Sequence, residues 1–77
     1  MKIEVFAILK DYFDSEFELQ PTPVSIDDLK QRLIELKPEV NNVLIYCRFA
    51  VNDEFIDNSY QLNENDIISI IPPSSGG

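Results

Sequence analysis

The sequence contains no histidine and a single cysteine, Cys47. Because histidine is the usual general base, its absence excludes the common serine–histidine and cysteine–histidine nucleophile arrangements. One cysteine cannot form a disulfide within the chain, which is typical of proteins of a reducing cytoplasm. Cys47 lies on the apolar side of an expected strand, so we interpret it as a buried structural thiol and not a reactive one. We therefore expect the chain to have no catalytic machinery of its own.

Glycine occurs only twice, at Gly76 and Gly77. No glycine-rich loop can therefore surround a phosphate group elsewhere in the chain. Carboxylates are plentiful, but they fall in expected caps and turns and do not have EF-hand spacing, so we expect no metal site.

Basic residues are few, with 6 lysines and arginines against 14 aspartates and glutamates and a net charge of −8. Such an acidic surface repels the phosphates of nucleic acids, so we expect no nucleic-acid partner. A basic protein surface would be attracted to it, although the charge also serves solubility.

Long apolar runs are absent, and no stretch approaches the ~18 residues of a membrane-spanning helix. The acidic residue Glu4 follows Met1 and Lys2 almost at once, so the chain does not begin with the basic n-region and long apolar stretch of a typical signal peptide. We therefore expect a cytoplasmic protein with no membrane partner. A hydrophobic content of 44% in 77 residues is that of one small globular domain.

The first twenty residues predict an antiparallel hairpin. Residues 2–9 alternate between two faces, and the apolar face is expected in the core; its members are Ile3, Val5, Ala7 and Leu9. Phe6 falls on the opposite face as a candidate exposed aromatic. Residues 16–20 repeat the alternation, with Phe17 and Leu19 inward, after a loop longer than the two-residue minimum.

A helix is predicted over residues 26–36. Ser25 can cap its first turn, and Asp28 makes a weak capping box with it. Pro38 ends the helix. One apolar stripe at helical spacing is expected to pack inward, namely Ile26, Leu29, Leu33 and Leu36.

The rest of the chain predicts strands. Residues 39–46 fit either a short helical turn or a connector, whereas residues 47–52 and 67–71 alternate as strands and a short strand is possible near Phe55. The order fits an α+β fold of the β-grasp (ubiquitin-like) type, with a mixed sheet of four to five strands, one main helix across one face and the last strand in the centre. We expect a domain of residues 1–73 and a flexible tail of residues 74–77.

The tail has the sequence Pro-Pro-Ser-Ser-Gly-Gly after an apolar strand. Pro72 and Pro73 cannot donate ladder hydrogen bonds, so they end the strand and keep the chain extended. Gly76 and Gly77 have no Cβ and can enter a channel that a side chain would block. The segment is either a slender arm that delivers the Gly77 carboxylate or an ordinary disordered end.

The sequence resembles the small, sulfur-carrying subunits of molybdopterin synthase, a ubiquitin-like β-grasp family. The resemblance covers nearly the whole chain and is strongest in "LNENDIISIIPPSSGG". The matching positions of the family pattern are Leu62, Asp66, Pro72, Pro73, Gly76 and Gly77. The family often has valine after Pro-Pro, where this chain has Ser74.

The resemblance implies a carrier cycle with no permanently bound cofactor. An E1-like activating enzyme would use ATP to adenylate the Gly77 carboxylate, and a sulfur donor would convert it to a thiocarboxylate. The tail, with Gly76 as its lead-in, would then give sulfur to cyclic pyranopterin monophosphate in the large synthase subunit. Two small and two large subunits would form a heterotetramer.

The pattern also predicts a docking face for the large subunit. Phe6 and Ile71 would be the centre of an apolar patch, unless a loop of the same chain covers Phe6. The predicted partner-binding residues are Phe6, Arg48, Ala50, Ser69, Ile71, Pro72, Pro73, Ser74 and Ser75.

Three other functions remain open at this stage. One is a sulfur carrier for another pathway, such as thiamine thiazole synthesis, whose members usually lack Pro-Pro before the tail. Another is a protein modifier whose terminus forms isopeptide bonds with lysines. The last is an interaction domain with an inert tail.

Overall fold

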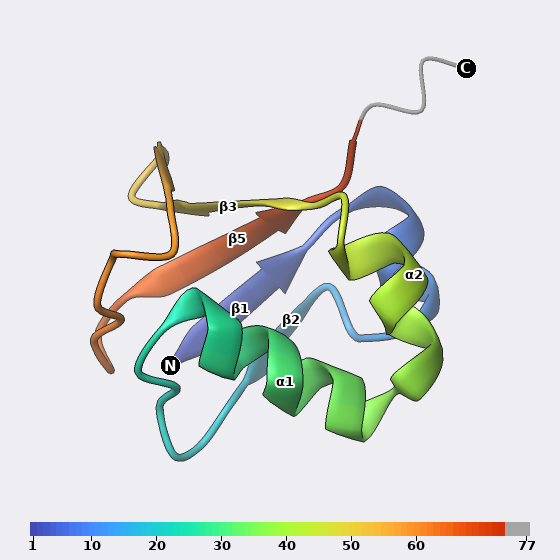
Figure 1. Ribbon diagram of the computed structural model, residues 1–77, viewed down its shortest axis with the longest axis horizontal. Helices are drawn as coiled ribbons and strands as arrows, with labels where there is room; N and C mark the ends of the chain where they lie inside the picture. Colours follow the sequence, from blue (N-terminus) through green and yellow to red (C-terminus); the bar gives the residue numbers. More distant parts are fainter. Residues whose placement is uncertain (74–77) are drawn as a thin grey trace.

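The chain folds as a five-stranded mixed sheet with its main helix across one face (Figure 1). The computed structural model describes residues 1–73. The elements are β1 (Lys2–Val5), η1 (Ala7–Asp11), β2 (Glu16–Glu18), α1 (Ile26–Leu36), η2 (Pro38–Val40), α2 (Asn41–Leu44), β3 (Arg48–Val51), β4 (Glu54–Ile56) and β5 (Ile67–Ile71), where η denotes a 3-10 helix. The predicted tail of residues 74–77 lies outside the described residues, so the domain boundary stays a prediction.

The strand order is β2-β1-β5-β3-β4, with the last strand in the centre as the sequence predicts. β1 and β5 pair in parallel, and the other neighbours are antiparallel. β5 is therefore hydrogen-bonded on both sides, and a central strand is the most firmly held part of such a sheet. The α+β prediction is confirmed.

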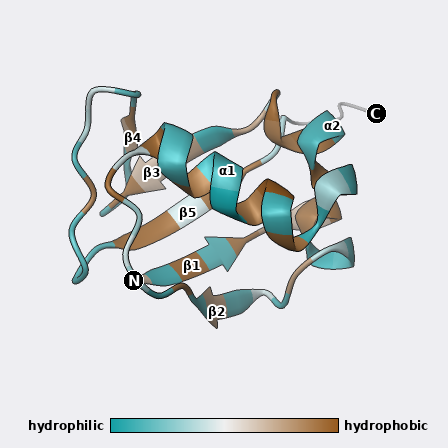
Figure 2. Ribbon diagram, turned by 60° about the horizontal axis from the view of Figure 1, so that its bottom comes forward, coloured by the Kyte–Doolittle hydropathy of each residue, from teal (hydrophilic) through white to brown (hydrophobic). Residues whose placement is uncertain are grey.

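The core lies between the sheet and α1, which crosses one of its faces (Figure 2). Ile3, Ile68 and Ile70 alternate with polar or exposed residues along the two central strands and are fully buried. Leu29 and Leu33 meet them from the helix. Burying side chains of this size contributes roughly 1.5–3 kcal/mol each.

The prediction that Ala7 points into the core is wrong. β1 ends at Val5, and Ala7 is exposed with a φ of 54°, a left-handed conformation that a strand cannot contain. The chain then turns through η1, whose tight three-residue period brings only Leu9 back into the core. The hairpin prediction is confirmed, and the Val5 N–H donates to the Ser15 carbonyl, 3.0 Å away, at the base of the loop.

The start of α1 has the predicted Ser25 cap but not the predicted capping box. The Ser25 hydroxyl accepts a hydrogen bond from the Asp28 N–H at 3.1 Å. The Asp28 carboxylate accepts from the Val24 N–H at 3.0 Å, one residue before the cap, and not from Ser25 as a regular capping box requires. These bonds fix the direction in which the chain enters the helix.

The end of α1 differs from the prediction, because Leu36 is 57% exposed. The next core residues are Val40 in η2 and Leu44 in α2, and both are buried. The ambiguous residues 39–46 are thus mainly helical. Among residues 1–73, no helix has the length and apolar character to cross a membrane.

Candidate functional site

The sheet brings three distant segments together at one of its ends. Val5 pairs with Ile70 in parallel, so the residues after β1 and after β5 leave the sheet on the same side. β3 is antiparallel to β5, and its first residue, Arg48, pairs with Ile71. The end of α2 therefore reaches the same place, since only residues 45–47 separate it from β3.

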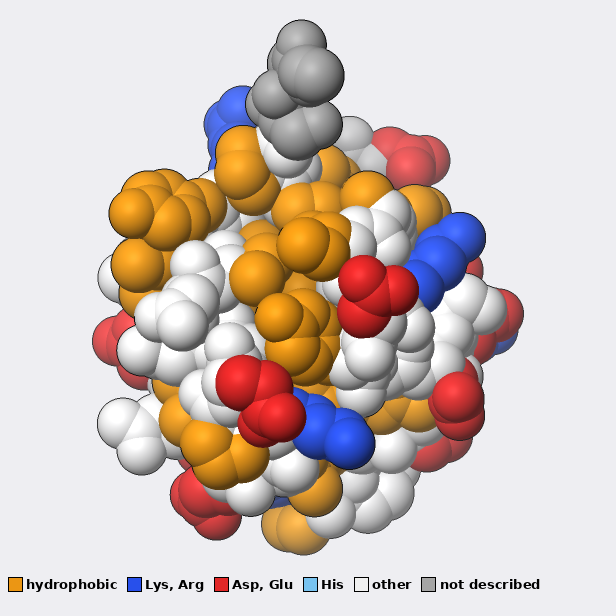
Figure 3. Space-filling model, turned by 90° about the vertical axis from the view of Figure 1, so that its right-hand side faces the viewer, with side chains coloured by type: hydrophobic (Ala, Val, Ile, Leu, Met, Phe, Trp, Pro, Cys, Tyr) orange, Lys and Arg blue, Asp and Glu red, His pale blue; other side chains and the backbone are white. Residues whose placement is uncertain are grey.

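An apolar groove of ≈ 580 Å³ lies where these segments meet. Figure 3 faces this side of the molecule and shows hydrophobic side chains gathered across it. The residues of this apolar groove are Phe6, Ala7, Ile8, Val43, Tyr46, Ile71, Pro72 and Pro73. Every one of them is apolar or aromatic, which is typical of a surface that another molecule covers.

The accessible side chains of the apolar groove are large. Phe6 is 43% exposed, so no loop within residues 1–73 covers it. Tyr46 is 66% exposed and Ile8 is also exposed. Pro72 is buried, whereas Pro73 is exposed. The last described residues thus form one wall of the apolar groove, with Pro72 fixed against the body of the domain.

The predicted docking face divides into two parts. Phe6, Ile71, Pro72 and Pro73 share the apolar groove. The other three, Arg48, Ala50 and Ser69, lie on the sheet face opposite α1. Arg48 pairs with Ile71, and Ala50 pairs with Ser69. Ser74 and Ser75, like Gly76 and Gly77, lie outside the described residues.

Ala50 offers little surface to a partner, which contradicts its predicted role. It is 6% exposed, because Phe55 and Ser69 flank it on the neighbouring strands. Ser69 is half-buried, and its hydroxyl donates to the Glu4 carboxylate at 3.4 Å. Arg48 remains accessible, and its guanidinium stacks 3.7 Å from the centre of the Phe55 ring.

Three residues of the apolar groove, Ile8, Val43 and Tyr46, are absent from the predicted site. No local pattern identifies the last two, because Val43 also packs against the core and Ile45, which is exposed like Tyr46, does not line the apolar groove.

Cys47 has the environment of a structural thiol. It precedes β3 and is partly buried, and its Sγ–H donates to the Val43 carbonyl at 3.3 Å. Burial raises the pKa of the thiol above its ordinary value, with the nearby Lys30 opposing this effect. The thiolate, which is the nucleophilic form, is therefore scarce at neutral pH.

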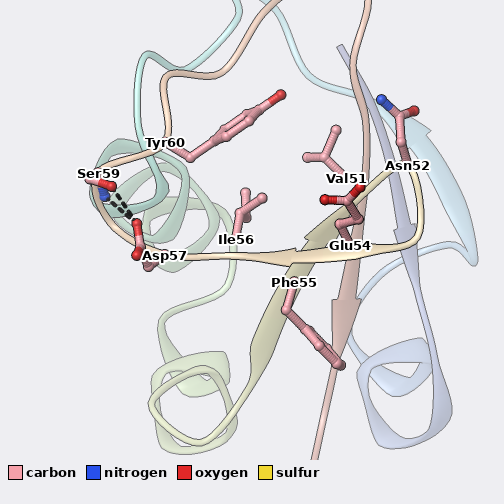
Figure 4. Close-up of a pocket in the computed structure, with 8 residues that line it drawn as sticks. All are labelled: Val51, Asn52, Glu54, Phe55, Ile56, Asp57, Ser59 and Tyr60. Carbon is pink, nitrogen blue, oxygen red and sulfur yellow. Dashed lines mark hydrogen bonds between the residues drawn. The ribbon is translucent and has the colours of Figure 1, made fainter.

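A second hollow, of ≈ 380 Å³, lies at the far end of β3 (Figure 4). Two of its polar residues pair with each other: Asp57 accepts from the Ser59 N–H at 2.9 Å and from its hydroxyl at 2.5 Å. The Tyr60 hydroxyl donates to Asp66 at 3.0 Å, and Asp66 also accepts from the Asn63 N–H at 3.0 Å. Asp66 of the predicted family pattern thus shapes the turn before β5.

Within residues 1–73, no three potential metal-ligating side chains are grouped together.

Comparisons with known proteins place this arrangement in a family. The model of the ThiS family matches residues 3–77. A molybdopterin synthase sulfur carrier subunit from Dictyostelium discoideum is 38% identical, over 99% of this chain and 94% of that protein.

Solved structures show the same fold. SAMP1 from Haloferax volcanii has a TM-score of 0.78 at 17% identity, covering 99% of this chain and 97% of its own. A chain in the complex of subunits 1 and 2 of the molybdopterin-converting factor from Helicobacter pylori 26695 has a TM-score of 0.70 at 26% identity, covering 99% and 96%. The chain belongs to the ThiS family of ubiquitin-like β-grasp proteins, together with sulfur carrier subunits of molybdopterin synthase.

Proposed function

We propose that this chain is the sulfur carrier subunit of a molybdopterin synthase and that it works in the cytoplasm. The observation that carries the proposal is the 38% identity to such a subunit over 99% of the chain. The Pro-Pro and Gly-Gly pairs of the tail, at the spacing of that family, support it further.

Gly77 carries the chemistry in this proposal. Its carboxylate attacks the α-phosphorus of ATP on an E1-like activating enzyme, which forms an acyl adenylate and releases pyrophosphate. A sulfur donor then displaces AMP, leaving a thiocarboxylate. ATP is consumed by the activating enzyme, and the carrier itself holds no permanent cofactor.

Sulfur transfer takes place in a partner, because the carrier has no histidine and its one thiol is largely protonated. The partner is the large synthase subunit, and two subunits of each kind form a heterotetramer. There the thiocarboxylate sulfur attacks a side-chain carbon of cyclic pyranopterin monophosphate and displaces an oxygen substituent from it. Water then hydrolyses the acyl–sulfur bond, which leaves the sulfur on the pterin and restores the Gly77 carboxylate. The complex of two subunits in the H. pylori structure supports such an assembly.

The apolar groove is the docking face of the carrier in this proposal. Phe6 and Ile71 supply apolar contact area, and Pro72 and Pro73 direct the following residues into the partner. Ser74, Ser75 and Gly76 form the lead-in to Gly77. Such a face agrees with the anatomy of protein interfaces, which have an apolar centre and a charged rim.

The proposal is tested by the intact mass of the chain after incubation with ATP, the activating enzyme and a sulfur donor. We expect an oxygen-to-sulfur mass increment at Gly77 and formation of molybdopterin when the large subunit and its precursor are added. A chain without Gly77 is the control. An unmodified terminus under these conditions would contradict the proposal, and isopeptide linkage to lysines of other proteins would favour a modifier.

A further inference from the structure

A smaller hollow lies beside the start of β3, close to the apolar groove. It has a volume of ≈ 250 Å³, and its lining includes Lys30, Cys47, Arg48, Phe55 and Asp57. Two of the six basic residues of the chain thus line one small cavity in a protein of net charge −8. We call it the basic hollow.

Arg48 is held on an aromatic platform. Its guanidinium lies 3.7 Å from the centre of the Phe55 ring, and Phe55 itself is 54% exposed. Figure 4 shows Phe55 pointing away from Ile56 and Tyr60. A guanidinium stacked on a ring keeps its N–H edges available for a carboxylate, and little further side-chain entropy is lost when one binds.

Lys30 approaches the basic hollow from α1. Its Nζ lies 5.5 Å from the centre of the Phe49 ring, within the range of a cation–π contact. Neither Lys30 nor Arg48 forms a salt bridge within residues 1–73, whereas Lys2 pairs with Glu16 at 3.0 Å. The two cations are therefore held in place by rings and not neutralised by carboxylates.

Asp57 is the acidic residue that lines the basic hollow. Its Oδ1 accepts two hydrogen bonds from Ser59, which hold the pKa of Asp57 below its usual value. This carboxylate is thus already bound within its own turn and makes no ion pair with either cation.

The basic hollow and the proposed docking face share no lining residue, but they are lined by directly adjacent residues of the chain and of the sheet. Arg48 pairs with Ile71, the residue before Pro72, and Cys47 follows directly after Tyr46 of the apolar groove. We propose that the basic hollow binds an acidic segment of the partner that docks on the apolar groove, with separate aspartate or glutamate side chains of that segment paired with Lys30 and with Arg48.

The inference rests on the proposed function, and it reverses the expectation from net charge. An overall charge of −8 predicts a basic partner, whereas the basic hollow requires acidic side chains beside the apolar anchor of that partner. The two expectations predict opposite effects of replacing Lys30 or Arg48 with glutamate. A basic partner surface would bind the variant more tightly, whereas an acidic segment would bind it more weakly.

The test is the affinity of the full chain for the large synthase subunit, measured by calorimetry with Lys30→Glu and Arg48→Glu variants. We expect each to bind about tenfold more weakly, because each replaces an attraction with a repulsion. Lys37→Glu, at an exposed position outside the basic hollow, makes the same change in net charge and is expected to bind like the original chain. Arg48→Gln and Lys30→Gln remove the charge but keep a polar side chain, and they replace any reversal variant that does not fold.

Unchanged or tighter binding by the Lys30 and Arg48 variants would overturn the inference while leaving the proposed function intact. If the original chain does not bind the large subunit at all, both fail. Phe55→Leu tests the platform, since it removes the ring but no charge. We expect a loss of about threefold with it and a smaller further loss from Arg48→Gln than in the original background.

Discussion

Val5 lies opposite Ile70 in the parallel ladder between β1 and β5. Because the two strands run in the same direction, Phe6 and Ile71 leave the sheet side by side and line one groove. The proposed docking face thus depends on pairing between the beginning and the end of the chain. A change that loosens β5 is expected to weaken docking together with the fold.

Replacing Ile70 with alanine should destabilise the whole domain. Ile70 is fully buried between the sheet and the helix, and a large-to-small change in such a core typically costs about 2–5 kcal/mol. Urea denaturation would measure the free energy of unfolding. Ile67→Ala in the same strand, at a partly exposed position, should cost no more than about 1 kcal/mol. Equal losses in the two variants would contradict the assignment of faces in β5.

Phe6→Asp should weaken binding to the large synthase subunit without unfolding the domain. Phe6 already exposes 43% of its surface, so the free protein loses little, but the complex would bury an unpaired carboxylate. We expect a loss of about 2 kcal/mol or more in calorimetry, as for an interface hot spot. Val24→Asp places the same charge on an exposed apolar residue outside the apolar groove. Equal affinity of the two variants would exclude the apolar groove as the docking face.

The sequence predicted the strands and the main helix where the periodic pattern is long. β5 and α1 have unbroken apolar stripes, and their bounds agree with the prediction. The turn at Ala7 escaped it, because a left-handed alanine and a 3-10 helix leave no glycine or proline signal in an apolar run. Local patterns cannot reveal a turn that tertiary packing imposes.

The candidate site was predicted only in part for a similar reason. Phe6 and Ile71 follow from strand alternation, but Tyr46 enters the apolar groove through a chain path that only the folded topology defines. The burial of Ala50 arises from its neighbours on two other strands, so its own segment gives no indication of it. The sequence pattern of one segment does not show which distant segments it will contact in the folded protein.

The loop between β3 and β4 offers a route to a more stable domain. Asn52 and Asp53 have φ values of 53° and 67°, the left-handed pair typical of a type I′ hairpin. Asp53→Gly should raise the free energy of unfolding by about 0.5 kcal/mol, because glycine has no Cβ to clash there. Asp53→Val should lower it by about 1–2 kcal/mol. If thermal denaturation ranks valine above glycine, the conformation of this turn is not the one described.

Cys47 should react slowly with alkylating reagents in the folded protein. Burial raises its pKa above the ordinary value of a thiol, so the thiolate needed for reaction is scarce at neutral pH. The rate–pH profile of iodoacetamide labelling should have its midpoint above that of the same chain in urea. The raised pKa also means that the stabilising contribution of the neutral thiol is complete below the pKa of the unfolded chain and is lost as the pH rises through the folded value. A midpoint at or below the unfolded one would contradict the burial of this thiol.

Gly76→Ala should separate docking from sulfur transfer. The substitution adds one Cβ to the proposed lead-in, which under the proposed function passes through a narrow channel of the partner, and it leaves the apolar groove unchanged. We expect affinity for the large subunit within about twofold of the original, since the contact surface is retained. Molybdopterin formation from the preformed thiocarboxylate should fall at least about tenfold, because a small displacement of the reacting group greatly reduces the rate. Val24→Ala, at an exposed position outside the apolar groove, serves as the control and should keep its activity. Full turnover by the Gly76 variant would show that the tail works without a narrow lead-in, and the reason proposed for the paired glycines would then fail.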